Sequence, residues 1–206
     1  MPLPFNHISL AGKMAERYPH IATGDFFLGN IAPDAVLAHP ACTEQEKFRT
    51  HLRGERARWL GDVMASLAAS DKSLFSLGYH MHLLTDIFFR DNCRSGYNAA
   101  GIPEEEHDKL AYRAASRGIH AMYGTEISRE QYEAWLALAK TYTVRDFPFG
   151  LTSAEMDGEL AFAGNLAQFP NLPAEENAPV DFADIYHRAL PYLDGIFGKY
   201  FERSET

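Results

Sequence analysis

Two side chains in one apolar segment are spaced for metal chelation. Between Gly78 and Asp86, His82 and Asp86 are four residues apart, so on a helix they lie one turn apart on the same face. An imidazole nitrogen and a carboxylate oxygen suit zinc, manganese or iron, and one carboxylate can bridge two ions. The alternative is a His–Asp hydrogen bond that satisfies two polar groups within a packed helix. The apolar neighbours favour a compensating partner, because burying an unpaired carboxylate costs several kcal/mol. His80, two positions from His82, is expected to point elsewhere and to have a supporting or core role.

Further candidate ligands lie upstream of this segment. Asp34 ends the run Gly-Asn-Ile-Ala-Pro-Asp, His51 follows Thr50, and His7 lies near the N-terminus. Taken with the Gly-Tyr-x-x-His82-Leu-Leu-Thr-Asp86 segment, these elements occur in an order that resembles the zinc-dependent phospholipase C family. The wider superfamily of that family includes the fungal single-strand-specific nucleases. The match covers roughly the first ninety residues.

The resemblance implies an all-helical domain that holds divalent metal ions. By motif, His51, His82 and Asp86 would bind one ion, and His7 and Asp86 would contribute to a neighbouring one. Asp34 would act as catalytic base or as an additional ligand. Two divalent ions are therefore expected, most simply zinc, with manganese or iron as alternatives.

The chain also departs from the family pattern. In the secreted phospholipases the mature N-terminal amino group is a ligand, whereas this chain starts Met1-Pro2, so that ligand is expected to be missing. The family's His-x-x-x-Glu pair on a following helix is not evident, which argues against a third metal. His120 is a candidate substitute because its neighbours are apolar. Glu104 and His107 look like parts of a hydrated first turn.

Two other interpretations remain open. His107-Asp108 is an adjacent His-Asp pair, as in the HD phosphohydrolases, although three glutamates precede it where that motif lies in an apolar helix. The chain could also be a helical binding module that keeps the scaffold and at most one structural metal without turnover.

The elements that must position these residues are predicted to be helices, because capping patterns recur and strand alternation is scarce. Asn6 is expected to cap a first helix that runs to Tyr18, and the Gly/Pro-rich stretch from Thr23 to Pro40 is expected to be irregular. Capping boxes begin at Thr43, Ser128 and Thr152. The remaining predicted helices run from Thr43 to Arg53 and on to Ala68 after Gly54, from Leu74 to Phe89, from Pro103 to Tyr123, and from Phe182 to Phe201 after a linker at Phe169 to Pro179.

Composition limits the class of protein. The 206 residues are 46% apolar and 23% charged, which is typical of one globular domain spanning residues 1–206. The net charge of −9, without a local run of lysine and arginine, argues against binding of long nucleic acids. The sequence contains no signal peptide pattern, no eighteen-residue apolar run and only two cysteines, so a cytoplasmic protein without membrane insertion is expected.

These observations predict an all-α, single-domain multi-helix bundle of the phospholipase C and nuclease type. The expected activity is metal-dependent hydrolysis of a phosphate ester, most simply a phosphodiester. The expected substrate is a soluble small molecule or a lipid phosphoester. Tyr79, Phe88 and Phe89 are expected to wall the pocket. The oligomeric state is not indicated by the sequence.

Overall fold

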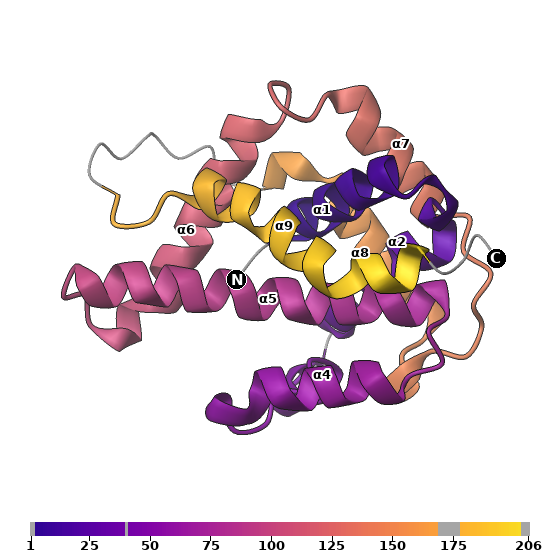
Figure 1. The fold of residues 1–206 in the computed structure, drawn as a ribbon, viewed down its shortest axis with the longest axis horizontal. Coiled ribbons are helices and arrows are strands. Elements are labelled where there is room, and N and C mark those ends of the chain that lie inside the picture. The colour runs from indigo at the N-terminus through magenta and orange to yellow at the C-terminus, as the bar shows by residue number, and fades with distance from the viewer. Residues whose placement is uncertain (1–2, 40, 169–177, 203–206) are drawn as a thin grey trace.

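The computed structural model describes residues 3–39, 41–168 and 178–202, and these residues form an all-α fold without a strand (Figure 1). The predicted fold class is therefore confirmed. The buried apolar side chains of the described residues form one contiguous core cluster. Within the described part of the chain, no helix combines the length and the apolar character needed to cross a membrane. The α-helices are α1 (Pro4–Arg17), α2 (Gly24–Gly29), α3 (Glu44–Thr50), α4 (Trp59–Ala69), α5 (Leu74–Ala99), α6 (Glu104–Met122), α7 (Arg129–Ala139), α8 (Ser153–Gly164) and α9 (Phe182–Phe201).

The long helix α5 is the element on which the others are arranged. It packs against α2, α4, α6 and α9, and in Figure 1 it runs the length of the molecule between α9 and α4. The prediction that it ends near Phe89 was wrong, since the helix continues to Ala99. Phe89, Cys93 and Tyr97 are spaced by four and all buried, so the apolar face of the helix simply continues.

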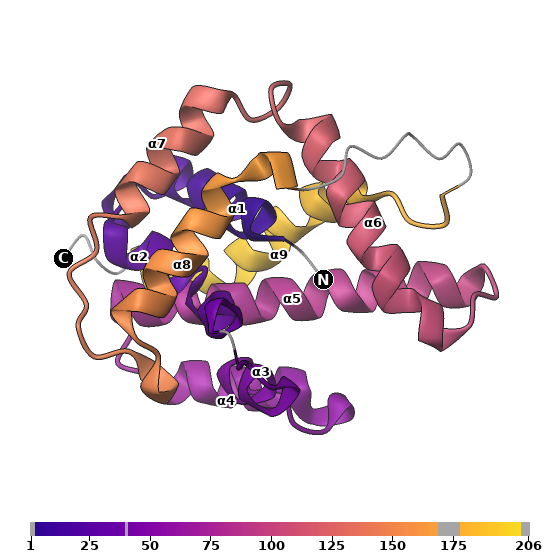
Figure 2. The same ribbon diagram turned by 180° about the vertical axis from the view of Figure 1, so that it is seen from behind.

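Helix α1 lies between α9 and α8, with α9 in front of it in Figure 1 and α8 in front of it in Figure 2. The helix begins at Pro4, with Leu3 as the N-cap, and not after Asn6 as predicted. Asn6 still serves this end of the helix, because its Oδ1 accepts a hydrogen bond of 2.9 Å from the backbone N–H of Leu3. The first turns are buried, so His7 lies inside the molecule.

The stretch predicted to be irregular from Thr23 to Pro40 contains helix α2 and the 3-10 helix η2 (Ala32–Ala38). Thr23 caps α2 by accepting a hydrogen bond from the N–H of Phe26. This short helix is stabilised by packing on α5, where the two backbones touch. A Cβ atom added at Gly29 would lie 2.1 Å from the carbonyl oxygen of Phe75, and one at Gly78 would lie 2.2 Å from that of Phe26. Glycine at both positions therefore permits the crossing.

The segment between α3 and α4 turns sharply. The capping box at Thr43 is confirmed, but α3 ends at Thr50, earlier than the predicted Arg53. Leu52 has a φ of +49°, in the left-handed region that L-residues adopt rarely. The chain then passes through the 3-10 helix η3 (Arg56–Arg58) into α4.

The second half of the chain follows the predicted pattern closely. The capping boxes at Ser128 and Thr152 are formed, Pro103 immediately precedes α6, and α9 has the predicted bounds. Within the predicted linker from Phe169 to Pro179, residues 169–177 lie outside the described residues.

Candidate metal centre

Five predicted ligands from four separate elements meet in the interior. His7 comes from α1, Asp34 from η2, His51 from the end of α3, and His82 and Asp86 from successive turns of α5. We call them the His/Asp cluster. Their ligand atoms form two groups, His7 with His82 and Asp86, and Asp34 with His51 and His82, in each of which all ligand atoms lie within 4.8 Å of one another. Each group could hold a metal ion.

Asp86 faces imidazoles on both sides. Its Oδ1 lies 3.5 Å from Nε2 of His7, and its Oδ2 lies 3.6 Å from Nε2 of His51. Asp34 completes the second group, with Oδ1 3.2 Å from Nε2 of His51 and Oδ2 3.9 Å from Nε2 of His82. The His7 and His82 rings stack with centroids 3.8 Å apart. The two groups share His82, and its single inward nitrogen, Nε2, could bind only one ion at a time.

Backbone carbonyls fix the orientation of two of the imidazoles. Nδ1 of His82 lies 2.9 Å from the carbonyl oxygen of Asn30, and Nδ1 of His51 lies 2.8 Å from that of Lys47. Because a carbonyl oxygen can only accept, each Nδ1 carries the proton and each Nε2 presents a lone pair to the cluster. This pairing of a metal-ligating histidine with a backbone carbonyl is common in metal sites.

Six buried polar atoms of the cluster have no hydrogen-bond partner among the described residues. These buried atoms are both ring nitrogens of His7, Nε2 of His51 and of His82, Oδ1 of Asp34 and Oδ2 of Asp86. Leaving one buried polar atom unpaired costs about 1–3 kcal/mol, so this many in one place calls for a shared partner. A divalent cation fits, because it accepts both imidazole and carboxylate donors.

The cluster keeps these donors in the protonation states that a cation needs. Burial, together with the neighbouring His7 imidazole, lowers the pKa of His82 to about 3, so its ring is neutral at pH 7. Burial alone would raise the pKa of Asp86, but the surrounding imidazoles outweigh it and lower that pKa to about 2. The pKa of Asp34 is likewise held well below its usual range by His51, His82 and Lys47, against the effect of burial.

One pocket reaches the cluster from the surface. It has a volume of about 420 Å³, and Asp34 is the cluster member that lines it. Lys47 also lines this pocket, with Nζ 3.8 Å from Oδ1 of Asp34. The other four cluster residues are at most 1% exposed. We call this cavity the Asp34 pocket.

Glu159 on α8 lines the Asp34 pocket and was not predicted from the sequence. It is 3% exposed, and its Oε1 has no hydrogen-bond partner among the described residues. Burial and the negative charge of Asp34 raise its pKa well above the ordinary value, which favours the protonated carboxyl group. A signal existed in the sequence, since Glu159 shares a helical face with Met156 and Ala163.

His120, by contrast, does not join the cluster. It is half-buried on α6 and belongs to neither metal-compatible group among the described residues. Its apolar neighbour Ile119 is buried as predicted, but α6 packs on α9 and meets α5 at Arg94 and Tyr97, which lie beyond Asp86 along that helix. His107 and Asp108 of the HD-like pair are absent from both groups as well.

The predicted pocket walls also differ from those observed. Phe88 stacks on Tyr192 and Phe89 packs on Phe182, so both face α9. Tyr79 lines a different, largely apolar pocket of about 590 Å³. The expectation that His80 points away from the cluster is confirmed, since its ring contacts the hydroxyl of Ser66 and the carbonyl oxygen of Ser76.

Comparisons with protein-family models, with curated proteins and with solved structures found no match to this chain.

Proposed function

We propose that the chain is a metal-dependent hydrolase of phosphate esters that acts on phosphodiesters. The observation that carries the proposal is the buried set of three histidines and two aspartates that have polar atoms without hydrogen-bond partners. Of these five residues, Asp34 lines a pocket that opens to the surface. The resemblance of the N-terminal segments to the zinc-dependent phospholipase C family supports the same activity. Zinc is the proposed ion, with manganese and iron as alternatives, because the donors are imidazole and carboxylate.

Two ions are proposed, and the five residues of the His/Asp cluster would hold them. When bound, divalent ions supply positive charge to the phosphoryl oxygens and acidify water. The chain itself supplies the shape and the proton transfers. Asp34, held as a carboxylate at the end of the pocket, accepts the proton of the attacking water, and Lys47 adds positive charge to the same wall.

Glu159 is the proposed proton donor to the leaving group. Asp34 and Glu159 line one pocket, and their surroundings shift the two pKa values in opposite directions. Such a pair is typical of a base and an acid that work together. The water oxygen bonds to phosphorus, the ester P–O bond breaks, and the departing alkoxide takes the proton of Glu159. The products are an alcohol and a phosphate monoester.

The first test compares His82→Ala with His187→Ala. His187 is a suitable control because it is exposed and pairs with Glu126, away from the cluster. We expect the purified wild type to hold about two divalent ions per chain and to hydrolyse bis(p-nitrophenyl) phosphate. Both properties should be lost in His82→Ala, by about 100-fold in activity, and kept in His187→Ala. Unchanged metal content and activity in His82→Ala would reject the site.

One observation favours a second candidate, a binding module with a structural metal. Four of the five ligand residues are almost completely buried, and closed sites are typical of structural zinc. Elemental analysis separates the two functions. A single tightly bound ion, with no hydrolysis under any added metal, would favour the module.

A further inference from the structure

A second pocket, next to the Asp34 pocket, is lined by arginines from two separate parts of the chain. It has a volume of about 250 Å³ and contains the side chains of Arg53, Arg56, Arg90 and Arg94. Only two carboxylates, those of Glu104 and Asp108, line it as well. We call it the arginine pocket. In a chain with a net charge of −9, such a concentration of guanidinium groups is not expected from composition.

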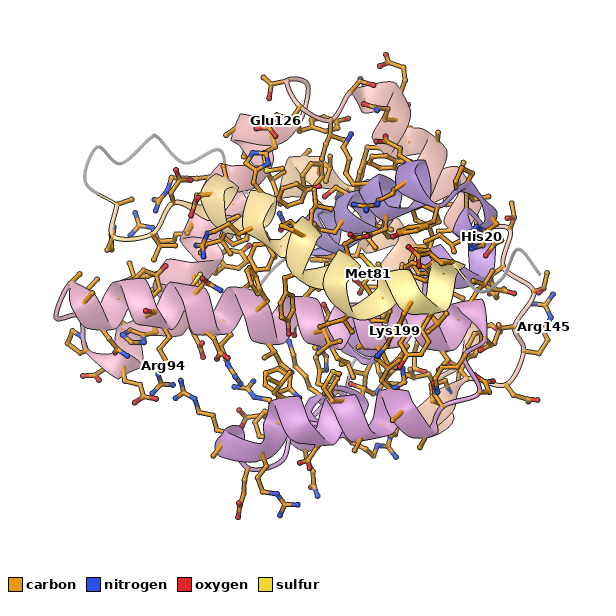
Figure 3. All side chains as sticks on the ribbon, viewed as in Figure 1. His20, Met81, Arg94, Glu126, Arg145 and Lys199 are labelled. Carbon is orange, nitrogen blue, oxygen red and sulfur yellow. The ribbon has the colours of Figure 1, made fainter. Side chains whose placement is uncertain are left out.

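Two of these arginines already converge on one oxygen atom. Nη2 of Arg94 on α5 lies 2.5 Å from Oε1 of Glu104, and Nη1 of Arg56 in η3 lies 3.2 Å from the same oxygen. Figure 3 shows Arg94 on the side of α5 that faces α4. Glu104 is 68% exposed, and ion pairs at such exposure contribute little to stability. An oxyanion with more charge than a carboxylate can therefore replace Glu104 at this point.

The other two arginines are held in place by an aromatic ring. The guanidinium carbon of Arg90 lies 4.4 Å from the centroid of the Trp59 ring, and that of Arg53 lies 5.5 Å from it. Arg53 has no carboxylate within ion-pair distance among the described residues. Stacking on an aromatic face orders a guanidinium and leaves the N–H groups of Arg53 available, whereas Nε and Nη2 of Arg90 also donate to Oδ1 of Asp91.

A buried ring nitrogen in the same pocket also lacks a partner. His107 is 7% exposed and lines the arginine pocket, with Nε2 3.0 Å from the carbonyl oxygen of Ile102. Its Nδ1 has no hydrogen-bond partner among the described residues. Because the carbonyl oxygen of Ile102 can only accept, Nε2 carries the proton and Nδ1 is an acceptor, which the P–OH group of a monohydrogen phosphate in the pocket would satisfy.

The two pockets share a wall. Arg53 and Asp108 line both the arginine pocket and the Asp34 pocket. The indole N–H of Trp59 donates a 2.7 Å hydrogen bond to the carbonyl oxygen of His51, a cluster residue. Trp59 therefore fixes the position of Arg53 and Arg90 relative to the candidate metal centre.

We propose that the arginine pocket binds a phosphate group, and that this group is a second phosphate carried by the phosphodiester substrate. Phosphate matches the observations because it carries close to two negative charges and accepts paired hydrogen bonds from guanidinium groups. The pocket volume admits one such group, and the shared wall allows a short linker to reach Asp34. The assignment of the second phosphate to the substrate rests on the proposed hydrolase function, whereas binding of phosphate to the pocket does not.

Binding is tested with inorganic phosphate by isothermal titration calorimetry on the purified protein, at constant ionic strength. The variants are Arg94→Gln and Arg56→Gln, and the control is Arg58→Gln, an exposed neighbour that pairs with Asp62 and does not line the pocket. We expect about tenfold weaker binding in each pocket variant and unchanged binding in the control. Circular dichroism checks folding, and Arg56 is exposed enough for its replacement to be tolerated. Equal affinity in all four proteins, or no binding by the wild type, would overturn the pocket.

The substrate assignment is tested with a matched pair of diesters, 2-methoxyethyl p-nitrophenyl phosphate and 2-(phosphonooxy)ethyl p-nitrophenyl phosphate, neither of which has a free hydroxyl that could attack its own phosphorus. We expect the phosphorylated diester to have the lower KM, by about tenfold, and we expect Arg94→Gln to remove this preference while the control Arg58→Gln keeps it. Hydrolysis of both diesters with equal KM would overturn the assignment to the substrate. If neither diester is hydrolysed, the hydrolase proposal fails, and phosphate titration still decides whether the pocket binds anions.

Discussion

His82 is the residue on which both metal-compatible groups depend. Its spacing from Asp86 follows from helical geometry, so this pair could be predicted from the sequence alone. His7, Asp34 and His51 could be predicted only from the order of motifs, because their approach depends on helix crossings that no local spacing encodes. His120 was expected to be a ligand because its neighbours are apolar. Apolar neighbours indicate that a residue is buried, but they do not indicate which helices it packs against.

Glu159 gives the most specific prediction at this scale. Glu159→Gln removes an acid whose deprotonation is opposed by burial, so the variant should be more stable at pH 7.5 than the wild type. A gain of about 1 kcal/mol would raise the Tm by about 2–4 °C, as measured by differential scanning calorimetry. The sign follows from the raised pKa. Protonation stabilises the folded wild type fully below the ordinary pKa of a glutamate, and this contribution is lost as the pH rises.

The same variant should lose turnover. If Glu159 protonates the leaving group, kcat falls by about 100-fold or more while KM changes little. The gain in stability should also shrink between pH 7.5 and pH 4.5. Lower stability at pH 7.5 together with normal kcat would contradict both assignments.

At the scale of elements, the crossing of α2 and α5 positions the centre. Gly78 allows the two backbones to touch. The carbonyl oxygen of Asn30, which follows α2, accepts a hydrogen bond from Nδ1 of His82. A methyl group at Gly78 would meet the carbonyl oxygen of Phe26 and so push α2 away from α5. The crossing therefore couples close packing of two helices to the orientation of a ligand.

Gly78→Ala should destabilise the protein by about 1–3 kcal/mol and weaken zinc binding by about 10–100-fold. Gly61→Ala on α4 is the matched control, because a Cβ atom there meets nothing within 4 Å. Alanine at Gly61 should increase stability slightly, since alanine favours a helix over glycine by about 1 kcal/mol. Chemical denaturation and competition with a fluorescent zinc chelator measure the two effects. Similar behaviour of the two variants would contradict the proposed role of the crossing.

The parts of the fold that could be predicted from the sequence are those whose signals lie within a few consecutive residues. Capping boxes at Thr43, Ser128 and Thr152 involve four consecutive residues, and all three were confirmed. Helix α2 was not predicted, because its glycines weaken the local helix signal and its stability comes from contact with α5. The extension of α5 beyond Phe89 was missed for a similar reason, since Cys93 and Tyr97 continue its apolar face among polar residues.

At the scale of the whole molecule, the cluster joins elements that are far apart in sequence. A cation held by the first group would join α1 to α5, and one held by the second would join η2 and the end of α3 to α5. A ligand that binds only the folded state stabilises it. Without the cation, the unpaired donors remain buried in the core. The stability of the molecule should therefore depend on metal content and on pH.

We expect chelation at pH 7 to lower the Tm, and the metal-free protein to lose further stability as the pH falls. The unfolded state takes up a proton at His82 near the ordinary pKa of 6.5, whereas the folded state does so only near 3. The unfolded state binds more protons in this range, so the contribution of His82 to stability is complete above about pH 6.5 and decreases below it. The lowered pKa of Asp86 likewise makes the folded state lose stability as the pH falls, in a lower pH range than for His82.

Thermal melts with and without a chelator, between pH 7.5 and pH 4.5, measure this dependence. The difference in Tm between the melts with and without chelator should become smaller toward pH 4.5, because protons compete with the metal for the imidazoles. Identical melts at pH 7.5 would show that no stabilising ion was bound.

The position of Trp59 has a practical consequence. Its indole bonds to the backbone of His51 and contacts Arg53 and Arg90, so it adjoins both the candidate metal centre and the arginine pocket. The chain has one other tryptophan, Trp135, which lies against Gly12 on α1. In a Trp135→Phe background, intrinsic fluorescence would come from an indole whose surroundings change when either site is occupied, and the protein would report its own ligands without an attached dye.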